Sequence, residues 1–161
     1  MHRNVANVVG HTDFNCLSVI QYAVDILKVK HVIVCGHYGC GGVLATMKGM
    51  RVGLVDNWLR HVDDVQQKHA KQLSGYRDEH VRGNHLCELN VIEQVLNVCN
   101  TTVIRDAWAR GQDVTVHGTI YGMRDGLLRD LKITASSLSE AQRKYERAIN
   151  SLPPPESYDN V

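Results

Sequence analysis

Residues 31–42, HVIVCGHYGCGG, contain the strongest fold signal in this chain. Residues 32–35 form a short continuous apolar run between His31 and Gly36, which is typical of a strand buried on both faces, as in a parallel sheet. A glycine-rich turn follows, and we expect a helix to begin near Gly42. In an open α/β sheet, ligands bind just beyond the carboxyl ends of the strands. This turn is therefore the first place to expect a functional site.

Two potential metal ligands, His37 and Cys40, lie two residues apart on the turn. Zinc favours imidazole nitrogen and thiolate sulfur, and this spacing lets both converge on one ion. The glycines permit a tight turn, and the start of the following helix would stabilise the Cys40 thiolate. The chain has nine histidines and five cysteines, so an H-x-x-C pair is by itself a weak signal. From spacing alone, a tight turn with a buried cysteine is the simpler alternative.

Helical and strand patterns alternate on either side of this turn. Helical periodicity or composition predicts four helical segments, at residues 14–28, 54–73, 85–109 and 139–150. Residues 113–121 alternate, so Val114, Val116 and Ile120 face one way, and residues 127–134 are a further candidate strand. We therefore predict an α/β fold with a largely parallel sheet flanked by helices.

Composition excludes several classes of partner. Lys and Arg total 18 and Asp and Glu total 17, so charge gives no argument for a nucleic acid or an anionic membrane. No apolar stretch approaches the length of a membrane span, and residues 1–12 lack the apolar core of a secretory signal. We expect a cytoplasmic protein with reduced cysteines. Residues 1–150 should form one domain, followed by a proline-rich tail at 151–161.

The remaining cysteines and histidines have simpler interpretations. Cys35 would share a face with His37 on an extended chain, which makes it an alternative ligand, but its place at the end of an apolar run favours the core. We interpret Cys16, Cys87 and Cys99 as buried small hydrophobes. We expect His117 to pack on the sheet. Polar surroundings predict solvated side chains for His61, His69, His80 and His85.

Residues 31–43, HVIVCGHYGCGGV, resemble the second zinc-ligand motif of the β-class carbonic anhydrases. Four further segments resemble that family in family order, with most similarity to its bacterial-type branch: HRNVAN at 2–7, TDFNCLSVIQYAV at 12–24, LCELNVIEQV at 86–95 and VTVHGTIYGMRDGLL at 114–128. The resemblance implies a zinc enzyme that interconverts carbon dioxide and bicarbonate through zinc-bound hydroxide. It also implies an α/β fold that assembles as a homodimer or tetramer.

The resemblance assigns roles to individual residues. It implies that His37 and Cys40 are zinc ligands, with Gly41 and Gly42 lining the active site beside them. Tyr22 is similar to a family tyrosine near the active-site mouth, although an ordinary interface tyrosine is an equal alternative. Arg3 and Tyr121 resemble two members of an inhibitory bicarbonate site, whose tryptophan has no counterpart in this sequence.

One family motif does not occur in these 161 residues. In the family, a Cys-x-Asp-Ser-Arg segment upstream supplies the first cysteine ligand, a gating aspartate and its arginine partner. We therefore expect a chain that is short at its N-terminus, without the family's first strand and N-terminal helices, and with impaired activity. An inactive truncated paralogue that serves as an oligomerisation partner or remnant is the alternative. A related enzyme acting on another small linear molecule, such as carbon disulfide, is a third hypothesis.

Overall fold

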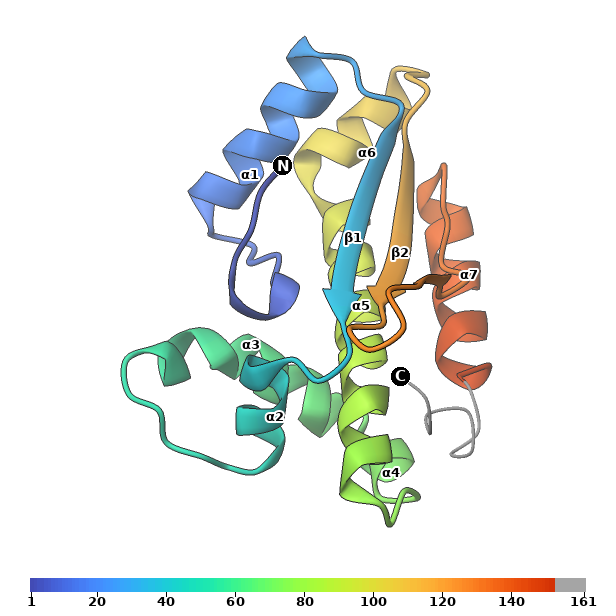
Figure 1. The fold of residues 1–161 in the computed structure, drawn as a ribbon. Helices are drawn as coiled ribbons and strands as arrows, with labels where there is room; N and C mark the ends of the chain where they lie inside the picture. Colours follow the sequence, from blue (N-terminus) through green and yellow to red (C-terminus); the bar gives the residue numbers. More distant parts are fainter. Residues whose placement is uncertain (153–161) are drawn as a thin grey trace.

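The computed structural model describes residues 1–152, which fold around a three-stranded sheet of order β1-β2-β3 (Figure 1). β1 (His31–His37) and β2 (Thr115–Tyr121) pair in parallel, from His31 opposite Thr115 to His37 opposite Tyr121. β3 (Leu128–Asp130) pairs antiparallel with the end of β2. The α/β prediction is confirmed. The long pair of strands is parallel, and a short antiparallel strand makes the sheet mixed.

The longest helix, α5 (Glu79–Asn100), packs along one face of the sheet (Figure 1). Its side chains are buried along most of its length, and two sheet glycines face it. A Cβ on Gly36 would lie 2.5 Å from Val91 Cγ2, and a Cβ on Gly118 would lie 2.9 Å from Val95 Cγ2. Both distances are far below van der Waals contact, so the two glycines let the helix approach the strands closely.

The other helices lie around this centre. α1 (Phe14–Gln21) continues into a π-helical turn, η2 (Tyr22–Ile26), and lies on the side of β1, whereas α7 (Leu138–Asn150) lies beyond β2 and packs on α5 (Figure 1). The remaining helical elements are η1 (Val5–Asn7), α2 (Gly41–Met47), α3 (Val55–Lys68), α4 (Ala70–Leu73) and α6 (Thr102–Ala109). No helix within residues 1–152 is long and apolar enough to span a bilayer.

The prediction of a single helix at 85–109 is wrong. The structure has two helices in this region, and the first of them begins earlier, at Glu79. The Asp78 side chain accepts a hydrogen bond from Val81 N and starts α5 at Glu79. Thr101 has an extended backbone (φ −60°, ψ 147°), and its hydroxyl caps α6 by accepting from Ile104 N. A threonine that satisfies a free amide at a helix start is a strong local signal, which the continuous apolar periodicity masked.

Two of the four histidines expected in solvent are buried. His61 and His80 are exposed, whereas His69 is 7% exposed and His85 is fully buried. His69 Nε2 lies 2.7 Å from Glu93 Oε1. A carboxylate on α5 therefore takes the place of the solvent expected around this imidazole. Burial, together with the charge of His69, lowers the pKa of His85 to about 4, so its imidazole is neutral at pH 7.

Cys35 is exposed, which corrects the expectation that it lies in the core. Alternation along β1 turns Val34 and Gly36 towards the interior and leaves Ile33 and Cys35 on the opposite face, where Ile33 is 58% exposed. Cys16, Cys87 and Cys99 are buried, as predicted. The predicted tail at 151–161 falls mostly outside the described residues.

Candidate metal centre

His37 is the last residue of β1, and its ring orientation is set by the turn that follows. His37 Nδ1 lies 2.9 Å from the carbonyl oxygen of Tyr38. An Nδ1–H that donates to this carbonyl leaves Nε2 unprotonated, which is the state of a metal-ligating imidazole. His37 is an exposed residue, which leaves its side chain accessible from solvent.

Cys40 lies at the start of α2, where the chain turns back towards the interior. It is the N-cap residue of α2 and is 6% exposed. Gly39 has φ +67°, in the left-handed region that glycine adopts without strain, and this conformation makes the turn between His37 and Cys40 possible. Both predicted ligands are therefore on one short turn. Their convergence on one metal ion remains a prediction.

The turn is held to the sheet and to α5 by groups that the sequence analysis did not assign. Tyr38 N donates to Tyr121 O at 3.0 Å, which continues the pairing of β1 and β2 into the turn. Tyr38 OH donates to Glu88 Oε1 at 2.5 Å. Burial and the neighbouring Glu88 carboxylate both raise the pKa of Tyr38, so the phenol stays protonated.

Cys87, on α5, lies against the backbone of the same turn. Burial raises the pKa of the Cys87 thiol to about 12, and the backbone amides of Cys40 and Gly39 oppose this rise. Cys87 is therefore a buried thiol, as expected, and it also contacts the turn that bears a predicted ligand. The sequence contained no signal for this contact, because Cys87 and Cys40 are far apart along the chain.

The two glycines that follow Cys40 have different surroundings. A Cβ on Gly41 would meet nothing within 4 Å, so this residue borders open space. A Cβ on Gly42 would lie 2.9 Å from Val5 Cγ1 and 3.1 Å from Leu59 Cδ2. Gly42 therefore allows close packing of the N-terminal segment and α3 against the turn.

The three remaining predicted site residues lie apart along the chain. Tyr22 is the first residue of η2 and is 58% exposed. Tyr121 is the last residue of β2, opposite His37, and is 37% exposed. Arg3 is exposed and its Nε donates to Met1 Sδ at 3.3 Å. Within residues 1–152, no hydrogen bond joins Arg3 to Tyr121, and a shared site for them remains a prediction.

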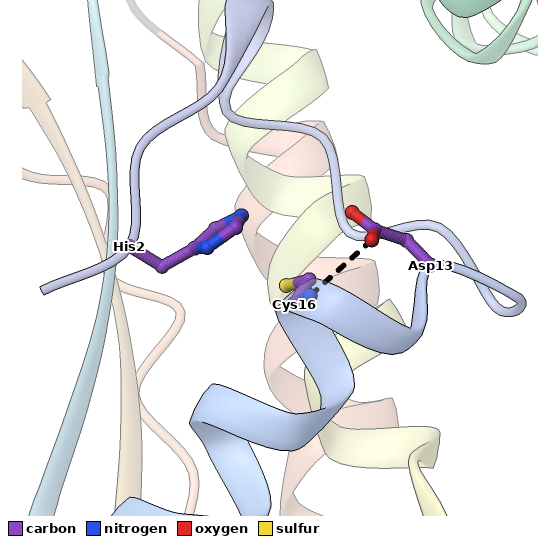
Figure 2. A group of neighbouring side chains, drawn as sticks. All are labelled: His2, Asp13 and Cys16. Carbon is purple, nitrogen blue, oxygen red and sulfur yellow. Dashed lines mark hydrogen bonds between the residues drawn. The ribbon is translucent and has the colours of Figure 1, made fainter.

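A second group of potential ligands, missed in the sequence, lies in the N-terminal region (Figure 2). One ligand atom each from His2, Asp13 and Cys16 lies within 4.8 Å of the other two. Cys16 is 4% exposed, and burial together with the Asp13 carboxylate raises the pKa of its thiol. The D-x-x-C spacing at a helix start indicates that Asp13 and Cys16 are neighbours, but the approach of His2 depends on the tertiary fold.

Known proteins resemble this chain over most of its length. The sequence model of the carbonic anhydrase family matches residues 1–128. The chain belongs to the β-carbonic anhydrase family. It is 44% identical to a carbonic anhydrase of Emericella nidulans over 146 residues, which are 90% of this chain and 64% of that protein. The chain thus spans less than two thirds of this relative.

Solved β-carbonic anhydrases have the same fold. A Coccomyxa β-carbonic anhydrase in complex with acetazolamide superimposes with a TM-score of 0.83 at 36% identity, covering 94% of this chain and 72% of that one. One of two tetrameric β-carbonic anhydrases of Sordaria macrospora superimposes with a TM-score of 0.77 at 39% identity, over 83% of this chain and 68% of that one. These comparisons confirm the family predicted from the sequence, while the bacterial-type branch remains a prediction.

Proposed function

We propose that this chain supplies part of the active site of a carbonate dehydratase, which hydrates carbon dioxide reversibly to bicarbonate. The observation that carries this proposal is the turn after β1. It presents His37 and Cys40 at the carboxyl end of β1, within the residues that match the family. Ligands bind at this end of an open α/β sheet.

The chemistry of the turn fits zinc. His37 would bind through Nε2, because Nδ1 faces the Tyr38 carbonyl oxygen, and Cys40 would bind through sulfur. When bound, zinc makes hydroxide available at neutral pH, because it lowers the pKa of water to about 7. The low exposure of Cys40 keeps its sulfur from bulk water, and the hydrogen bond from Tyr38 to Glu88 holds the intervening backbone in place.

The open space beside Gly41 supports a role for this residue in admitting a small linear substrate, because no side chain lies above it. Tyr22 would lie at the mouth of the site. Tyr121 lies opposite His37, which supports a role near the site, and its joint action with Arg3 on bicarbonate is the regulatory hypothesis.

Two ligands are half of a tetrahedral zinc site. In the family, the first cysteine and an aspartate–arginine pair come from a Cys-x-Asp-Ser-Arg segment, which does not occur in these 161 residues. We propose that the site is completed by such a segment and that the protein assembles as a dimer or tetramer. The tetrameric relatives support the assembly. The predicted cytoplasmic location remains untested.

Stopped-flow hydration of carbon dioxide tests the proposal. The 161-residue chain should show little or no turnover, and a version extended upstream by a Cys-x-Asp-Ser-Arg segment should be active. His37→Ala should abolish turnover and remove the zinc held at the turn after β1 in the extended protein, while His80→Ala, a change at an exposed histidine, should leave both unchanged. A short chain as active as the extended one would overturn the account of a half-site. If the extended protein were inactive but assembled with a complete carbonic anhydrase, the result would favour the alternative function, an inactive paralogue that serves as an oligomerisation partner.

A further inference from the structure

His2, Asp13 and Cys16 bring together three ligand types outside the turn after β1. Their nitrogen, oxygen and sulfur ligand atoms lie within 4.8 Å of one another, a spacing that a small cation can bridge with little movement. Figure 2 shows the imidazole of His2 extending from the N-terminal segment towards the first turn of α1, which bears Cys16. The cluster shares no ligand with the turn that bears His37 and Cys40.

Two of the three side chains are fixed by the start of α1. Asp13 Oδ1 accepts hydrogen bonds from Asn15 N at 3.1 Å and from Cys16 N at 3.3 Å. Within the described residues, the hydrogen bonds of this carboxylate use only Oδ1, which leaves Oδ2 for a cation. Cys16 is on the helix itself and is almost fully buried, so its sulfur faces the protein interior.

The third side chain reaches the cluster from a folded N-terminal segment. Asn4 closes a loop by donating from Nδ2 to Val8 O at 2.7 Å and accepting from Val8 N at 2.9 Å. The same Nδ2 lies 3.4 Å from His2 Nε2. The loop therefore carries His2 back towards α1, and a cation held by all three residues would tie the N-terminal segment to that helix.

We propose that His2, Asp13 and Cys16 form a binding site for a zinc-like divalent cation, distinct from the predicted zinc ligands His37 and Cys40. Imidazole nitrogen, carboxylate oxygen and thiolate sulfur all bind zinc, and three protein ligands leave a fourth tetrahedral position for water or another ligand. The partial exposure of His2 and Asp13 gives an ion a route from solvent, while Cys16 closes the inner side.

Cobalt(II) is a suitable probe, because a cysteine thiolate bound to cobalt gives a charge-transfer absorption that nitrogen and oxygen ligands do not. The titration uses the 161-residue chain with His37→Ala and Cys40→Ser, so the result does not depend on the proposed function. We expect one equivalent of cobalt, a thiolate charge-transfer band, and displacement of the cobalt by zinc.

Variants in this background identify the ligands. Loss of an outer partner of a metal ligand already costs about 10–100-fold in affinity, so His2→Gln should weaken cobalt binding by about 100-fold or more. Asp13→Asn keeps an oxygen for the helix cap and should also weaken binding, while Cys16→Ser should remove the charge-transfer band. His11→Gln, a change at an exposed histidine of the same region, is the matched control and should bind as the parent does.

A parent without a thiolate band would overturn the proposal, and the three residues would then be neighbours that hold no metal. Equal affinity in His2→Gln and His11→Gln would also overturn it. Because Cys16→Ser alters a buried position and can reduce folding, far-ultraviolet circular dichroism accompanies each titration. The His2→Gln comparison then decides the outcome, since His2 is only half-buried.

Discussion

Two buried glutamates on α5, Glu88 and Glu93, are held by different kinds of partner. Glu93 is 7% exposed and accepts hydrogen bonds from His69 at 2.7 Å, Lys68 at 2.9 Å and Tyr145 at 2.5 Å. Glu88 is fully buried, accepts from Tyr38, and lies 3.9 Å from the imidazole of His85. Lys68 and His69 lie at the end of α3 and Tyr145 lies on α7, so Glu93 connects α5 to two other helices. Glu88 instead binds Tyr38, which lies on the turn of the candidate metal centre.

At Glu93, hydrogen bonds from its partners oppose the effect of burial on the pKa. Burial alone would raise the pKa of Glu93, but hydrogen bonds from His69, Tyr145 and Lys68 lower it to about 2. The imidazole beside Glu88 is neutral at pH 7, since burial lowers the pKa of His85 to about 4. We therefore expect Glu93 to act mainly on global stability, and Glu88 to act on the geometry near His37 and Cys40.

Removing the Glu93 carboxylate should have the largest effect. Glu93→Ala leaves buried donors on His69 and Tyr145 without an acceptor and should reduce the free energy of unfolding by about 3 kcal/mol. Urea denaturation followed by circular dichroism measures the change. Glu146→Ala, at an exposed position of α7, is the control. A loss no greater than in that control would show that the three-partner network contributes little.

Lowering the pH should reduce the free energy of unfolding in two successive ranges, the first set by His85, beside Glu88, and the second by Glu93. The folded pKa of His85 lies below its ordinary 6.5, so the unfolded chain takes up a proton first and stability falls as the pH drops from about 6.5 to 4. The folded pKa of Glu93 lies below its ordinary 4.5, so its contribution is present above that pH and is lost as the pH falls towards 2.

Urea midpoints measured across this pH range test the assignment. His85→Gln should flatten the upper part of the profile, and Glu93→Gln should flatten the lower part. If both variants changed the same part of the profile, the separation of the two regions would be wrong.

The tyrosines that donate to the two glutamates, Tyr38 and Tyr145, should have smaller effects on stability than Glu93 itself. Tyr38→Phe removes a hydrogen bond to a fully buried carboxylate and should cost about 2 kcal/mol in unfolding free energy. Tyr145→Phe should cost about 1 kcal/mol, because Glu93 keeps His69 and Lys68 as donors. In a protein extended to complete the site, only Tyr38→Phe should also weaken zinc retention, measured by competition with a chelator. An equal effect of both changes on zinc would contradict a local role for Tyr38.

The smallest effect should come from a third α5 glutamate, which is exposed. Glu79 Oε1 lies 2.7 Å from Lys48 Nζ, and the hydrogen bond and charge of Lys48 lower its pKa. Exposed pairs of this kind contribute little, because water and salt screen them. Glu79→Gln should leave the urea midpoint unchanged within error. A loss comparable to that of Glu93→Ala would mean that burial does not distinguish these glutamates.

Local patterns predicted the elements that depend on near neighbours in the sequence. The apolar run at 32–35 and the alternation at 113–121 correspond to β1 and β2, and the charged segment at 139–150 corresponds to α7. The H-x-x-C turn also follows directly from the glycines around it. These signals work because strand alternation, helix periodicity and glycine conformation are set within a few residues.

Sequence alone determined the family of this chain, through several segments in family order. It also located the two longer strands and the two candidate ligands on the turn after β1, because these rest on short contiguous motifs. Only the tertiary structure decided the surroundings of His69 and His85, the exposure of Cys35 and the approach of His2 to Asp13 and Cys16. These depend on contacts between distant segments, such as Lys68 and His69 with Glu93. Whether a polar side chain meets water or a buried partner is a property of the packed fold, and no local pattern encodes it.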